Sequence, residues 1–60
     1  MTQPVKKTDT HAVVPAPAHG ASIFSIINRA TGEEVNRVEG YSAAVAEQAK
    51  QDALAKLRGV

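Results

Sequence analysis

The segment from residue 21 to residue 40 most constrains the fold of this 60-residue chain. Its first part, ASIFSIIN, is rich in β-branched and aromatic residues, RATG has the composition of a turn, and EEVNRVEG returns to strand composition. Gly32 suits the left-handed position of a loop between two strands, which glycine enters without a Cβ penalty. The sequence therefore predicts an antiparallel hairpin with strands at about 22–28 and 34–39, in which Phe24 faces Val38 and Ile27 faces Val35.

A helix is predicted to follow the hairpin, at about residues 43–58. Ser42 is a suitable N-cap, Asp52 and Lys56 form an acid-to-base pair at helical spacing, and Arg58 and Gly59 suit the C-terminal end. Helical periodicity predicts that one side of this helix faces the sheet and carries mostly small side chains. The residues of this inward stripe are Val45, Ala46, Ala49, Ala53 and Leu57, with Leu54 at one edge. The predicted fold class is thus α+β, a small ββα unit over residues 21–60.

Residues 1–20 are predicted to form a disordered N-terminal arm. Three prolines interrupt the segment, and it shows no sustained helical or strand period. The arm is either a spacer or a short linear motif that adds to the groove or sheet edge of a partner. The candidate motif residues are Val13, Val14 and Pro15.

The predicted hairpin is apolar on both faces, whereas one helix covers only one of them. The first face shows Phe24, Ile26 and Val38, and the second shows Ile23, Ile27 and Val35 around Ser25 and Arg37. Because a chain of this length is marginally stable, leaving three aliphatic side chains in water is costly. The sequence therefore predicts a homodimer that buries the second face. Two alternatives stay open: a monomer whose second face awaits another protein, and an N-terminal tail that folds back over it.

Composition excludes several functional classes. Residues 21–60 carry five basic and five acidic side chains, so the predicted domain is neutral and poorly suited to binding phosphate. Without cysteine, and with only His11 and His19 in the predicted arm, no metal, cofactor or catalytic site is expected, and the protein is predicted not to be an enzyme. No segment resembles a membrane span or a signal peptide, so a complete, cytoplasmic product without a membrane partner is expected.

By exclusion, the sequence favours a small non-enzymatic regulator or inhibitor that occupies a surface of a larger protein. Its expected partners are a second copy and that larger protein, and its candidate interface residues are Ile23, Ile27, Val35, Arg37 and Tyr41. One alternative is a dimeric ribbon that binds nucleic acid through Asn28, Arg29, Asn36 and Arg37, and another is a self-assembling structural or accessory subunit.

Overall fold

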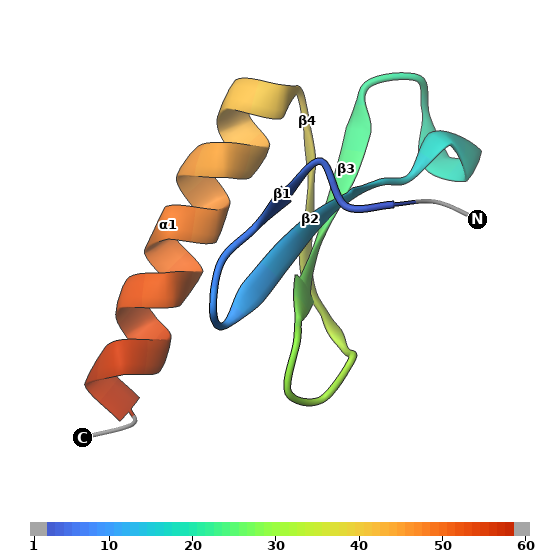
Figure 1. Ribbon diagram of the computed structural model, residues 1–60. Coiled ribbons are helices and arrows are strands. Elements are labelled where there is room, and N and C mark those ends of the chain that lie inside the picture. Colours follow the sequence, from blue (N-terminus) through green and yellow to red (C-terminus); the bar gives the residue numbers. More distant parts are fainter. Residues whose placement is uncertain (1–2, 59–60) are drawn as a thin grey trace.

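The computed structural model describes residues 3–58 and shows a four-stranded antiparallel sheet with one long helix on one of its faces (Figure 1). The elements, in chain order, are β1 (Lys6–Lys7), β2 (His11–Pro15), the short 3-10 helix η1 (Pro17–His19), β3 (Ile23–Asn28), β4 (Glu34–Glu39) and α1 (Tyr41–Arg58). The order across the sheet is β1-β2-β3-β4, so each strand pairs with its neighbours in the sequence. The α+β class is confirmed, with two more strands than predicted.

The β3–β4 hairpin forms where it was predicted. Phe24 pairs with Val38, as expected, and Gly32 adopts a φ of 78° in the turn. Beyond Ile26 the register shifts, and Ile27 pairs with Glu34 instead of Val35. Val35 is therefore the extra residue of a β-bulge, and the bulge moves its side chain to the face that α1 covers.

The predicted disordered arm is corrected by the structure, because residues 6–19 form two strands and η1. Val13 pairs with Ile26 and Val14 with Ser25, so β2 takes up the second edge of β3. A hairpin edge offers unpaired backbone groups, and here the chain's own N-terminal segment pairs with them. Pro15 is the last residue of β2, where its missing N–H interrupts no further pairing. Residues 1–2 lie outside the described part of the chain, as does Gly59, which was predicted at the C-terminal end of the helix.

The core lies between the sheet and the first half of α1. Val13, Ile26 and Ala44 are fully buried, and Phe24 and Val38 pack against them. The helix begins at Tyr41, earlier than predicted, and the Ala44 amide donates to the Gly40 carbonyl. Ser42 is consequently inside the first turn, not at the N-cap.

The predicted inward stripe of α1 is wrong. Ala46, Ala49 and Ala53 are exposed, and Leu57 is 74% exposed; only Val45 and Leu54 are partly buried. The buried positions are instead Ala44 and Gln48. Gln48 donates to the backbone carbonyls of Lys6 and His11 over 3.4 and 3.2 Å, and Asp52, one turn later, binds side chains of the same hairpin. The side of α1 that faces the sheet therefore carries Ala44, Gln48 and Asp52, and not the predicted stripe.

Candidate functional site

Asp52 joins α1 to the turn between β1 and β2. Its Oδ1 lies 2.9 Å from the Thr8 hydroxyl, 2.5 Å from the Thr10 hydroxyl and 3.0 Å from Nδ1 of His11. These four residues are called the Asp52 cluster below. The His11 side chain is 3% exposed and that of Asp52 is 21% exposed, so the contact is largely shielded from water. The cluster therefore holds a buried imidazole in one orientation.

The hydrogen bonds of the Asp52 cluster assign the protonation of its groups. Burial raises the pKa of Asp52, but hydrogen bonds from Thr10, Thr8 and His11 outweigh this effect, and the net pKa is lowered. Asp52 is thus a carboxylate that only accepts, and we assign the Nδ1 proton of His11 to the bond with it. The other ring nitrogen, Nε2, remains available for a hydrogen bond to a neighbouring group.

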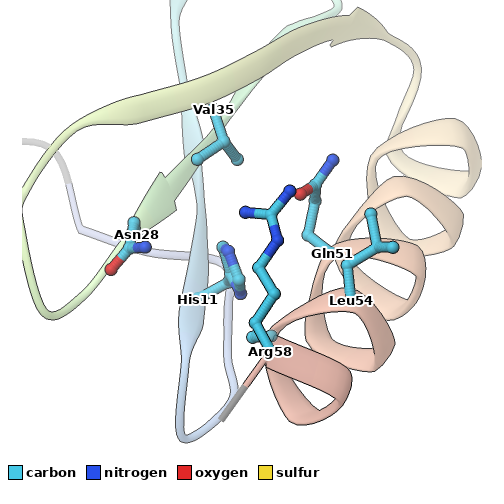
Figure 2. Close-up of a pocket in the computed structure, with 7 residues that line it drawn as sticks. His11, Asn28, Val35, Gln51, Leu54 and Arg58 are labelled. Atoms are coloured by element: carbon cyan, nitrogen blue, oxygen red, sulfur yellow. The ribbon is translucent and has the colours of Figure 1, made fainter.

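His11 also lines a pocket of about 290 Å³ between the sheet and the C-terminal half of α1 (Figure 2). This His11 pocket is lined by His11 of β2, Asn28 of β3, Val35 of β4, and Gln51, Leu54, Ala55 and Arg58 of α1. Figure 2 shows the Arg58 side chain extending along the pocket beside His11. The lining thus combines an aliphatic wall with a cation and two polar groups.

The opposite side of the sheet, called the open face below, is formed by residues that alternate with the core residues: Ala12, Val14, Ile23, Ser25, Ile27, Glu34 and Arg37. Within it, Arg37 contacts both carboxylate oxygens of Glu34, at 3.2 and 3.0 Å. The Ser25 hydroxyl donates to Glu34 over 2.6 Å, and His19 of η1 lies 3.0 Å from Arg37. These bonds, from Arg37 first and then Ser25, lower the pKa of Glu34. An ion pair therefore lies along β4, on one side of the open face, and contacts Ser25 of β3.

Five residues were predicted to form an interface, and the structure divides them among three places. Ile23, Ile27 and Arg37 share the open face, where Ile23 lies beneath Gly20 at the end of η1. Val35 is on the other side, in the His11 pocket, because of the bulge. Tyr41 is 50% exposed and packs edge to face on Phe24, with ring centroids 5.9 Å apart.

The residues of the predicted linear motif lie within the sheet. Val13 is fully buried in the core, and Val14 and Pro15 are partly buried in β2. Their pairing chemistry was predicted for a partner's sheet edge, but the edge they occupy belongs to β3 of the same chain.

The side chains considered for reading nucleic-acid bases are engaged elsewhere. Arg37 binds Glu34, Arg29 donates to the Thr8 carbonyl over 2.6 Å, and Asn28 accepts the amide protons of Ala30 and Thr31. In addition, β3 is flanked by β2 and β4. The hairpin is therefore not the free two-stranded ribbon that insertion into a groove requires.

Sequence reasoning missed His11 and Asp52 as partners. They are 41 residues apart, and His11 was assigned to the arm. The available signal was the TDTH stretch, whose Thr-x-Thr alternation puts two hydroxyls on one side of an extended chain.

Comparisons with protein-family models, with curated proteins and with solved structures give no match to this chain. Within residues 3–58, no helix combines the length and apolar character needed to cross a bilayer. In the same residues, no three histidine, cysteine, aspartate or glutamate side chains are grouped as metal ligands.

Proposed function

We propose that the protein is a non-enzymatic interaction protein that works as a homodimer, in which the open faces of two copies pack together. The observation that supports this is the asymmetry of the sheet. One face is covered by α1, whereas on the opposite face η1 lies over the end near Ile23 and reaches Arg37 through His19. Val14 and Ile27 remain partly exposed there, beside the Glu34–Arg37 pair. Aliphatic side chains around an arginine are a common composition of protein interfaces.

A second copy is the occupant that this surface fits best. Glu34 and Arg37 place both charge signs on the β4 side of the open face, at 34% and 42% side-chain exposure. A two-fold axis through this region brings the acid of one copy to the base of the other and stacks aliphatic groups on each other. The face is thus complementary to itself, which a partner of strong single charge would not be.

The sheet edges are less suitable for association than the open face. On β4 the outward amide of Arg37 already donates to the Asn36 side chain over 2.8 Å, and the strand carries the bulge at Val35. The other edge is β1, which has two residues, both lysines. Bulges, short strands and edge charges all oppose strand addition. These features disfavour open-ended assembly through the edges and leave a closed dimer as the proposed form.

The regulatory or inhibitory activity is proposed to use residues that such a dimer leaves outside. Tyr41 and Leu57 are the most exposed of the large apolar side chains among residues 3–58, and both belong to α1. A helix surface of this kind is a common site for engagement by a larger protein.

The oligomeric state tests the dimer. Light scattering on a sizing column, over a wide concentration range, is expected to give a dimer for the native chain and a monomer for Ile27→Glu. Leu57→Glu, which adds the same charge on the outer side of α1, is the matched control and should stay dimeric. Circular dichroism verifies that both variants fold. A native chain that is monomeric at every concentration, or two variants that dissociate equally, would contradict the proposal.

Photo-crosslinking tests the proposed division of the surface. A crosslinker at position 27, in cells that make the protein, is expected to trap a second copy. The same group at position 41 or 57 is expected to trap a larger protein. If position 27 traps only a larger protein, the open face serves that partner and the dimer is excluded.

A further inference from the structure

The His11 pocket lies on the helix side of the sheet, away from the open face, and its lining has two chemically distinct parts. Val35, Leu54 and Ala55 provide aliphatic surface, and the polar side chains of His11, Asn28 and Arg58 share the same space (Figure 2). Its volume of about 290 Å³ lies at the lower limit for pockets that hold drug-sized ligands. At roughly 30 Å³ per water-sized group, it accommodates on the order of ten non-hydrogen atoms.

The polar groups of the pocket keep hydrogen-bonding capacity for a ligand. Asn28 uses its carbonyl oxygen to accept the amides of Ala30 and Thr31, which leaves its NH₂ group as the donor. His11 uses Nδ1 within the Asp52 cluster, which leaves Nε2. No hydrogen bond from the Arg58 guanidinium is found among residues 3–58. The side chains of Arg58, Asn28 and His11 therefore line one pocket, and each keeps a polar group that no bond within residues 3–58 uses.

We infer that this pocket binds a small carboxylate with a short aliphatic chain. Arg58 is the bidentate partner for the two carboxylate oxygens, and Asn28 offers a further donor. The aliphatic part of the ligand packs against Val35 and Leu54, which are otherwise partly exposed to water. This inference goes beyond the proposed dimer, because neither the surface nor the residues are shared.

His11 forms one wall of the pocket and is held in a fixed orientation there. Its Nδ1 is engaged with Asp52, which comes from α1 like Arg58, while β3 and β4 contribute the uncharged Asn28 and Val35. The carboxylate is therefore recognised by the Arg58 cation and the Asn28 amide.

Titration with isovalerate, followed by two-dimensional NMR of the full chain, tests the inference. Isovaleramide, which has the same aliphatic part and no charge, is the ligand control. Isovalerate is expected to shift the signals of Val35, Leu54 and the His11 ring, and to bind at least about tenfold more tightly than the amide.

Arg58→Gln and Lys56→Gln form the matched pair of variants. Both remove a cation from the exposed last turn of α1, but only Arg58 lines the pocket. Arg58→Gln is expected to weaken isovalerate binding at least about tenfold, and Lys56→Gln to leave it unchanged. Equal losses in both variants, equal affinity for acid and amide, or shifts confined to other residues would overturn the inference. Arg58→Gln should keep the native oligomeric state, and Ile27→Glu should keep isovalerate binding, so the two proposals can fail independently.

Discussion

The two hairpins of the sheet contact α1 through different chemistry. The β3–β4 hairpin offers Phe24, Ile26 and Val38, which form the core together with Val13 and Ala44. The β1–β2 hairpin adds a largely polar attachment: Asp52 accepts the hydroxyls of Thr8 and Thr10 and the ring N–H of His11, and Gln48 donates to backbone carbonyls.

The two kinds of contact have different roles: apolar burial stabilises the fold, and hydrogen bonds fix the position of the N-terminal hairpin on α1. Apolar burial is proportional to area and does not specify direction, whereas several hydrogen bonds to one carboxylate require one geometry. We therefore expect the Val13–Ile26–Ala44 core to provide most of the folding free energy, and the Asp52 cluster to determine where the N-terminal hairpin sits and at what pH it stays there.

Ile26→Ala is expected to have the largest effect. Ile26 is fully buried on an interior strand, and its truncation destabilises the fold by about 2–5 kcal/mol. That is much of the stability of a chain this small, at roughly 0.05–0.15 kcal/mol per residue. Urea unfolding should show both hairpins lost in one transition. Leu57→Ala, at the exposed end of α1, should change stability by no more than about 0.5 kcal/mol. Separate transitions for the two hairpins would show that they do not share one core.

Asp52→Asn should affect the N-terminal hairpin selectively. The substitution removes a charged acceptor from Thr8, Thr10 and His11, at an expected cost of about 1–3 kcal/mol. Hydrogen exchange is expected to accelerate at the amides of Val5 and Thr8, which pair within β1–β2.

The control positions for this measurement lie in the other hairpin and in the same turn. The amides of Asn28 and Gly40, bonded within the β3–β4 hairpin, should keep most of their protection. Asp9→Asn, an exposed carboxyl in the β1–β2 turn, should change neither set. Equal loss of protection in both hairpins would contradict the claim that the Asp52 cluster holds the N-terminal hairpin selectively.

Acid should weaken the same attachment. Because the folded state lowers the pKa of Asp52 below its usual 3.8, this carboxyl stabilises the fold above that pH, and the contribution disappears as the pH falls through the lowered pKa. Glu34 and Glu47 also have lowered pKa values, so all forms lose stability in acid. The stability difference between the native chain and Asp52→Asn should therefore shrink between about pH 5 and about pH 2, as urea midpoints would measure. A difference that stays constant over this range would contradict the assignment of Asp52 as ionised.

Glu34→Gln is expected to have the smallest effect. The expectation applies to the monomer, at concentrations below those at which the proposed dimer forms. In a single copy the partner of Glu34, Arg37, is exposed on the open face, where water screens the pair. The change in the urea midpoint should be smaller than that of Asp52→Asn and should vanish at high salt. Glu33→Gln, next to it in the turn, serves as the control. An effect as large as that of Asp52→Asn would mean that the open face is shielded from solvent, as in a dimer.

The difference between the two hairpins also explains which parts of the fold could be predicted from the sequence. The β3–β4 hairpin and α1 are specified by local signals: strand composition around a glycine turn, and a run of helix-forming residues. The β1–β2 hairpin has no such signal, because three prolines disrupt the pattern and β2 is completed only by pairing with β3. Val13 and Val14 were predicted to add to the groove or sheet edge of a partner, and in the structure they pair with β3. What the sequence did not reveal was that the edge lies in the same chain.

The rotation of α1 was predicted wrongly for a related reason. Apolar periodicity favoured the face with Ala46, Ala49, Ala53 and Leu57, but alanine gains little from burial. In the structure, the side of α1 with Gln48 and Asp52 faces the sheet, because the N-terminal hairpin presents carbonyls and hydroxyls that need hydrogen-bond partners. His11 lines the pocket because the N-terminal hairpin packs on this side of α1, and the helix sequence alone does not predict that packing.

The order β1-β2-β3-β4 has a consequence for how the chain folds. Each strand meets a neighbour that is close in the sequence, so the sheet has a low contact order and its hairpins can form early. The bonds of Thr8 and Thr10 to Asp52 instead close loops of 44 and 42 residues. Such closures carry the larger entropic penalty and come late. Substitutions in the Asp52 cluster should therefore accelerate unfolding and leave the refolding rate nearly unchanged, which stopped-flow kinetics can measure.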